Sequence, residues 1–153
     1  MSKLPEPRTL DFLLAQISRL HHTRAHQLFE AIGLYRGQPP VLRRLWQQEG
    51  LTHTELAERV KITPATVTKM LQRMEKAGFV LRKPDSTDQR ISRVYLTDAG
   101  RAIQAKVEAI WQQMEQDAFV GFTQEELILL RQFLTQIRAN LAQAAGENVP
   151  MEK

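Results

Sequence analysis

The stretch LTHTELAERVKITPATVTKMLQRMEKAGFVLRK, residues 51–83, carries the strongest local structural signals in the chain. Thr52 and Glu55 have the spacing of a capping box, in which each side chain bonds the backbone N–H of the other residue. Such a pair satisfies two otherwise unpaired N–H groups at a helix start. The sequence therefore predicts a short helix over residues 53–60.

A second helix start lies three residues beyond the first helix. Thr63 is a good N-cap residue, and Pro64 follows at the first helical position, where a missing N–H costs nothing. We expect this helix to run to Ala77 and to stop at Gly78. Two short helices joined by a tight turn are typical of a helix-turn-helix.

The second helix has two distinct faces when its residues are placed 100° apart. The apolar face holds Val67, Met70, Leu71 and Met74. The opposite face holds Ala65, Lys69, Gln72, Arg73 and Lys76, with Thr66 and Thr68 on its flanks. Three cations, one amide and small side chains suit a DNA major groove, where cations reach phosphates and Gln72 can bond an adenine edge. An ordinary solvated amphipathic helix would show the same pattern.

The residues that follow change to a strand pattern. Residues 79–83 and 93–96 predict two strands, and residues 84–92 predict a polar loop between them. Four cations lie in or beside this loop: Arg82, Lys83, Arg90 and Arg93. An arginine on an extended tip can enter the narrow minor groove, and a carboxylate two residues earlier, here Asp88, can hold its guanidinium. Asp-Arg pairs are common in loops, but that alternative leaves the four neighbouring cations unexplained.

The segments on either side of this unit are predicted to be helical from the spacing of their apolar residues and from the capping and stop residues at their ends. The predicted helices cover residues 10–32 after Thr9, a short segment from Pro39 to Gly50, a helix from Thr97 to before Gly121, and a helix from the Thr123/Glu126 capping box to Gly146.

The first and last helices each carry an apolar stripe about 22 residues long. A lobe of about 50 residues cannot bury both stripes, so we expect them to pack on each other and on a second copy of the chain. A monomeric helical bundle is the alternative. The predicted fold is mainly α with a small β-hairpin wing. A winged helix-turn-helix DNA-binding lobe (residues 35–97) is flanked by a helical dimerisation region (residues 1–34 and 98–147), and residues 148–153 form a frayed tail.

Composition narrows the class of protein. At 153 residues, 42% hydrophobic and 25% charged, the chain has the make-up of an ordinary globular domain. No window has the ~18 apolar residues of a membrane helix, and the start lacks a signal-peptide core, so we expect a cytoplasmic protein. The absence of cysteine excludes a disulfide, a thiolate metal site and a cysteine nucleophile.

The positive charge is concentrated in the middle of the chain. Residues 52–101 hold 10 basic and 6 acidic groups, whereas residues 102–153 hold 4 basic and 7 acidic groups. Residues 1–51 hold 7 basic and 4 acidic groups. Basic residues gathered in one segment are typical of a nucleic-acid-binding surface, although a charged stretch is also common on an ordinary solvated face.

Signs of enzymatic or metal chemistry are weak. The sequence has no glycine-rich phosphate loop and no serine elbow, and caps explain most carboxylates near helix starts. His22 and His26 are one turn apart, as metal ligands can be, but Glu30 is the only obvious carboxylate on that face. We expect neither an enzyme, nor a metal site, nor a cofactor, and no ligand-binding residue is assigned.

Residues 52–101 resemble the winged helix-turn-helix of the MarR family of bacterial transcription regulators. The resemblance is carried by the stretch quoted above and by the wing DSTDQRISRVYLTDAGR (85–101), with its run Asp88-Gln89-Arg90, then Val94-Tyr95-Leu96-Thr97, then Gly100. It implies a homodimer with intertwined terminal helices and two lobes on a pseudo-palindromic site. It also implies that Arg90 enters the minor groove, that Asp88 orients it, and that residues 63–73 read the major groove.

The resulting hypothesis is a homodimeric, sequence-specific DNA-binding repressor that a small aromatic or anionic ligand releases. A winged-helix protein-interaction module or an RNA-binding module, without specific DNA binding, is the alternative. The predicted DNA contacts are Thr52, His53, Thr63, Ala65, Thr66, Thr68, Lys69, Gln72, Arg73, Arg82, Lys83, Asp88, Arg90 and Arg93.

Overall fold

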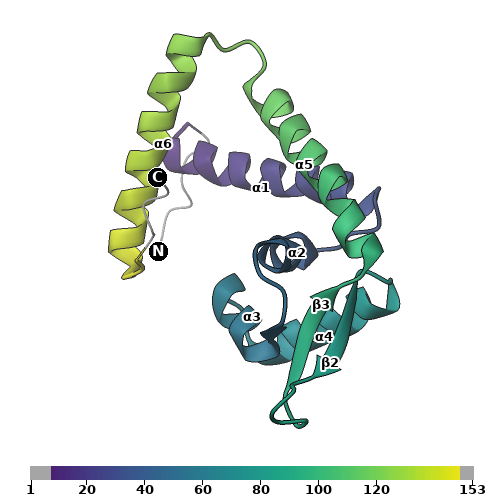
Figure 1. Ribbon diagram of the computed structural model, residues 1–153. Helices are drawn as coiled ribbons and strands as arrows, with labels where there is room; N and C mark the ends of the chain where they lie inside the picture. Colours follow the sequence, from purple (N-terminus) through teal and green to yellow (C-terminus); the bar gives the residue numbers. More distant parts are fainter. Residues whose placement is uncertain (1–7, 149–153) are drawn as a thin grey trace. The chain divides into compact units, whose positions relative to one another are not determined.

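The computed structural model describes residues 8–148, so almost all of the predicted frayed tail lies outside the described residues. The fold is mainly helical with one small antiparallel sheet, which confirms the predicted fold class (Figure 1). In chain order the elements are α1 (Leu10–Glu30), α2 (Gln38–Gln47), β1 (Leu51–Thr52), α3 (His53–Val60), α4 (Pro64–Lys76), β2 (Val80–Pro84), β3 (Ser92–Leu96), α5 (Asp98–Phe119) and α6 (Gln124–Ala145).

The predicted caps fix where the helix-turn-helix begins. The Thr52 hydroxyl accepts from the Glu55 amide at 3.2 Å, and the Glu55 carboxylate accepts from the Thr52 amide at 2.8 Å. The Thr63 hydroxyl accepts from the Thr66 amide at 3.2 Å, directly before Pro64. Both helix starts are therefore confirmed. The first helix ends at Glu30 rather than at residue 32, because the next amides, those of Ile32 and Gly33, bond to carbonyls three residues back instead of four.

The sheet has one more strand than the sequence predicts. Its order is β1-β3-β2, with both pairings antiparallel. The short β1 pairs Leu51 with Val94 and Thr52 with Arg93. Two residues are too few to show a strand period, so this element was missed. The two wing strands lie within one residue of their predicted bounds.

One hydrophobic core joins α2, α3, α4 and the sheet. On α4, Val67, Leu71 and Met74 are buried and Met70 is half-buried against the same core. The apolar face predicted for this helix is thus confirmed. Its burial fixes the rotation of α4, so the polar face is held outward.

Hydrogen bonds tie the start of α5 to this lobe. The Trp46 indole donates to the Gly100 carbonyl at 2.9 Å, and the Thr97 amide donates to the Phe79 carbonyl at 3.1 Å. A Cβ placed on Gly100 would clash with the Phe79 carbonyl oxygen, so only glycine permits this approach. These contacts around Gly100 therefore position both the sheet and the start of α5.

The chain divides into two compact units, residues 1–114 and 115–153. The first contains α1 and the lobe, and Phe29 of α1 stacks edge-on against Trp111 with ring centroids 5.2 Å apart. The second contains the end of α5 and all of α6. None of the helices within residues 8–148 has the length and apolar character that a membrane span requires.

Candidate nucleic-acid interface

The polar face of α4 is open to solvent. Burial of the opposite face leaves Ala65, Thr66, Lys69, Gln72 and Arg73 exposed, all from the predicted contact set. A helix of this kind, with small residues near its start and cations along its length, can approach a groove closely and bind phosphates on either side.

Thr68, at the edge of this face, bonds to another helix. Its hydroxyl lies 3.0 Å from Nδ1 of His53, the first residue of α3. The other ring nitrogen, Nε2, is buried and has no hydrogen-bond partner among the described residues. Burial lowers the pKa of His53, Arg82 lowers it further, and Glu75 opposes the shift. His53 is half-buried and its Nδ1 is engaged by Thr68, and its predicted direct contact with DNA stays a prediction.

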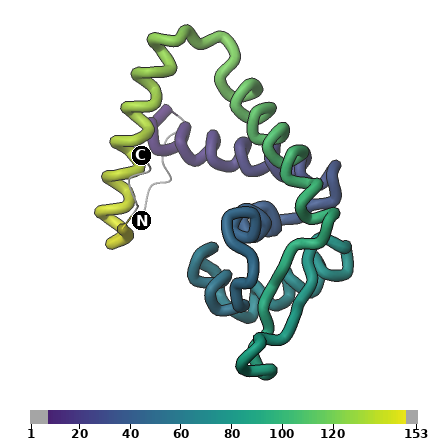
Figure 2. The backbone as a smooth tube through the Cα atoms, viewed as in Figure 1, coloured from purple at the N-terminus to yellow at the C-terminus, as the bar shows by residue number. Residues whose placement is uncertain are grey.

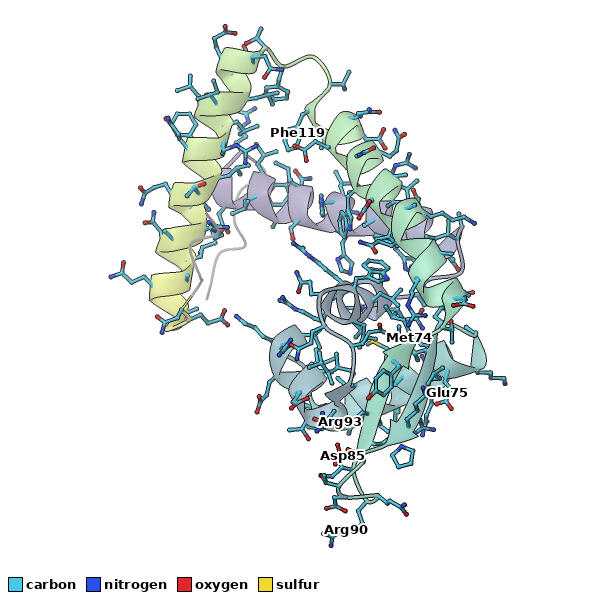
Figure 3. All side chains as sticks on the ribbon, in the orientation of Figure 1. Met74, Glu75, Asp85, Arg90, Arg93 and Phe119 are labelled. Atoms are coloured by element: carbon cyan, nitrogen blue, oxygen red, sulfur yellow. The ribbon has the colours of Figure 1, made fainter. Side chains whose placement is uncertain are left out.

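The β2–β3 hairpin projects from the lobe as a narrow wing (Figure 2), and Arg90 lies at its outer end (Figure 3). The Arg90 side chain is 91% exposed, yet its guanidinium is not free. Nε and Nη2 donate to the two oxygens of Asp88, each at 3.0 Å, and the Arg90 amide donates to Oδ1 at 3.1 Å. These bonds lower the pKa of Asp88 and raise that of Arg90, so both stay charged. The tip therefore presents one oriented cation.

A second carboxylate organises the loop beneath the tip. Asp85 accepts from the Thr87 hydroxyl at 2.6 Å and from the Thr87 and Asp88 amides, each at 3.1 Å. Hydrogen bonds from Thr87, then from Arg93, hold the pKa of Asp85 well below its usual range. The sequence reasoning did not single out Asp85, although an aspartate two residues before a threonine in a polar loop is a recognisable turn signal.

Arg93 is bonded within the protein. Its Nε donates to Asp85 at 2.5 Å and its Nη1 donates to the Gly50 carbonyl at 2.8 Å, and only 34% of the side chain is exposed. The predicted contact of Arg93 with DNA stays a prediction, since these bonds occupy Nε and Nη1 while the side chain remains half-buried. Arg93 connects the wing loop to the segment before β1.

The other two wing cations are exposed but not isolated. Arg82 Nε lies 2.6 Å from a Glu75 carboxylate oxygen on α4, so its charge is partly neutralised. The Lys83 ammonium lies 5.3 Å from the centre of the Tyr95 ring, a cation–π contact. Of Arg82 and Lys83, Lys83 is thus the cation whose charge is less neutralised by its neighbours.

The histidines of α1 do not gather a ligand set. His26 Nε2 lies 3.6 Å from a Glu30 oxygen, and no group of three or more metal-ligating side chains with suitable geometry occurs within residues 8–148.

Comparisons with known proteins agree with this geometry. The MarR family model matches residues 34–92. The chain is 25% identical to an uncharacterized HTH-type transcriptional regulator, YybA of Bacillus subtilis, over 84% of this chain and 85% of that protein. Among solved structures, a single-substitution mutant of S. aureus MepR is 26% identical with a TM-score of 0.77, covering 87% of this chain and 98% of that one. A different mutant of MepR, bound to an oligodeoxyribonucleotide, is 27% identical with a TM-score of 0.63 and the same coverage.

Proposed function

The chain belongs to the MarR family of winged helix-turn-helix, DNA-binding transcription regulators, and from that membership we propose that it is a homodimeric repressor of a pseudo-palindromic operator. The observation that carries the DNA-binding part of the proposal is the Asp88–Arg90 pair at the wing tip. A guanidinium held in place at the end of a narrow projection fits the minor groove, where negative potential is strongest. Because Asp88 already holds it in place, this guanidinium loses little conformational freedom when it binds DNA.

In this proposal the polar face of α4 enters the major groove. Gln72 reads a base edge, while Lys69, Arg73 and Lys83 bind phosphates. Thr63 and Thr66, whose hydroxyls lie 2.8 Å apart at the helix start, approach the backbone there. The proposed contacts are Thr52, Thr63, Ala65, Thr66, Thr68, Lys69, Gln72, Arg73, Arg82, Lys83 and Arg90, with Asp88 orienting Arg90.

Exposed apolar faces support the dimer. On α1 the exposed apolar residues are Leu10, Leu13, Ile17 and Leu20, and on α6 they are Ile128, Leu129, Phe133, Leu134, Ile137 and Leu141. No residue of α6 is buried within the single chain. Apolar faces this long are rare on monomeric surfaces, and a second copy would cover them. We therefore assign α1, α5 and α6 to the dimerisation region.

Duplex DNA is the favoured partner over RNA or protein. The major groove of A-form RNA is too deep and narrow for an α-helix, whereas B-form DNA admits α4 and offers a minor groove to the wing. A competition assay with a labelled operator duplex tests this choice. Unlabelled operator DNA should compete about a thousandfold better than DNA of unrelated sequence, and RNA of the operator sequence should compete poorly. Equal competition by all three would contradict specific DNA binding.

We further propose that a small aromatic acid releases the DNA. A cavity of about 490 Å³, in the usual size range for small-molecule sites, lies between α2 and α5. Arg43 contributes a cation to its lining, and Trp46 and Trp111 contribute aromatic rings. Glu108 also lines the cavity, and its carboxylate accepts a hydrogen bond from Gln104. A carboxylate on an aromatic ring matches the cation and the rings. A hundredfold release requires that the ligand bind the DNA-incompetent form better by about 2.7 kcal/mol.

We expect an aromatic acid from a tested panel to weaken operator binding. Mild peroxide should not cause a release of DNA that added thiol reverses. The chain has no cysteine, and Met74 is buried. Fluorescence anisotropy with a labelled operator measures both responses. Arg43→Gln should reduce the response to the acid without changing operator affinity in its absence. Thiol-reversible release by peroxide, or an unaltered ligand response in Arg43→Gln, would contradict this proposal.

A further inference from the structure

His53 is placed to influence DNA reading through Thr68. It begins α3, and its Nδ1 lies 3.0 Å from the hydroxyl of Thr68 on α4. Thr68 lies between the buried Val67 and the exposed Lys69. A bond at this position therefore joins the first helix of the helix-turn-helix to the edge of the face that reads DNA.

The environment of the ring accepts the neutral form and disfavours the imidazolium. A neutral imidazole has one N–H donor and one acceptor nitrogen, so it can bond Thr68 in either tautomer. The imidazolium carries N–H groups on both nitrogens, and its Nε2 proton would be buried without an acceptor among residues 8–148. The positive end of the α3 dipole adds to this penalty, because His53 is the first helical residue.

The charges around the ring come from two other elements. Arg82 on β2 repels a positive ring, and Glu75 on α4 attracts it. These two groups pair with each other at 2.6 Å, so their fields largely cancel and burial is the main effect. The pKa of His53 is therefore lowered in the folded state. The neutral ring contributes its full share of folding stability at pH values above the ordinary histidine pKa. That contribution is lost as the pH falls toward the lowered pKa of His53 in the folded state.

We propose that His53 is a positioning residue for the DNA-reading face, and that its protonation weakens operator binding by breaking the contact with Thr68. This inference rests on the proposed DNA-binding function. The neutral ring holds Thr68 and the adjoining turn of α4 in place. A charged ring must move to bring its buried Nε2 proton to water, and α4 then loses its link to the start of α3. Operator affinity thereby becomes dependent on pH below neutrality.

The test compares the wild type with His53→Asn from pH 7.5 to 5.5 at constant ionic strength. Asparagine offers a polar atom at about the Nδ1 position and does not titrate. Wild-type affinity for an operator duplex, measured by fluorescence anisotropy, should fall about tenfold more than that of the variant over this range. His26→Asn controls for a histidine on α1, outside the lobe, and should retain the wild-type profile.

Nuclear magnetic resonance of the DNA-free wild type gives a second readout that depends on no variant. The amide signals of residues 66–69 should shift with pH together with the His53 ring signal. Identical pH profiles for wild type and His53→Asn, or a ring that titrates without any shift at residues 66–69, would overturn the inference. Failure to bind any duplex at pH 7.5 would overturn the proposed function instead, and the DNA-free titration would still test the link between His53 and Thr68.

Discussion

Arg90→Ala is expected to lower operator affinity roughly 10- to 100-fold. The substitution removes the exposed guanidinium that Asp88 holds at the wing tip. Each lobe of the proposed dimer would lose one cation from its proposed DNA contact, so the slope of log K against log salt should flatten by about one unit per lobe. Fluorescence anisotropy at several salt concentrations measures both quantities.

Two neighbouring substitutions serve as controls for Arg90→Ala. Gln89→Ala changes an adjacent exposed residue and should leave both affinity and salt slope unchanged. Asp88→Asn keeps the Arg90 cation but loses the charged bidentate partner, and should give a smaller loss of affinity than Arg90→Ala. If Arg90→Ala matches the wild type in both affinity and slope, the wing does not touch DNA.

Arg93→Ala separates wing architecture from DNA contact. Because Arg93 bonds Asp85 and the Gly50 carbonyl, its loss should lower the Tm of the free protein by about 3 °C. Arg90→Ala should leave the Tm unchanged, since both Arg90 and its partner lie on the exposed tip. Equal Tm values for the two variants would contradict the distinction drawn between the two arginines.

A double substitution on α6, Phe133→Glu with Ile137→Glu, is expected to convert the protein to a monomer at micromolar concentration. Phe133 is 61% exposed in the single chain and Ile137 lies one turn further along the same face. Burying four carboxylates in a symmetric interface carries a desolvation penalty that exceeds the stability of a typical dimer contact. Analytical ultracentrifugation reports the change, and operator affinity should fall at least a hundredfold because one lobe then binds alone.

Gln132→Glu with Gln136→Glu provides the matched control, with the same added charge on exposed positions of the same helix. This variant should remain dimeric. A wild-type protein that sediments as a monomer at micromolar concentration would contradict the dimer directly. A double glutamate variant of Phe133 and Ile137 that stays dimeric would place the interface elsewhere.

The helix-turn-helix was predictable because its signals are local. The capping residues act within one turn of their own helix starts: Thr52 and Glu55 on α3, and Thr63 and Pro64 on α4. The spacing of the apolar residues of α4 likewise indicates one buried face. The Asp88–Arg90 contact was predictable for the same reason, since the two residues are only two positions apart.

Contacts between distant segments could not be predicted from the sequence. Arg93 bonds the Gly50 carbonyl 43 residues away, and His53 bonds Thr68 15 residues away. Sequence shows that these side chains are polar or charged, but not which acceptor the folded chain brings to them. These two bonds within the protein were therefore not predicted, and the DNA contacts predicted for Arg93 and His53 stay predictions. The strand β1 was missed because its two residues are too few to show a strand period.

Hydroxyl-radical footprinting on an operator obtained by selection from random duplex DNA tests the central claim most directly. A dimer that reads DNA with two copies of α4 and two wings should protect two half-sites on one face of the duplex, with centres roughly 34 Å apart. The protein with Arg90→Ala should lose protection where the wing tips lie and keep it over the half-site centres. Protection of a single half-site, or failure of selection to enrich any sequence, would contradict the account.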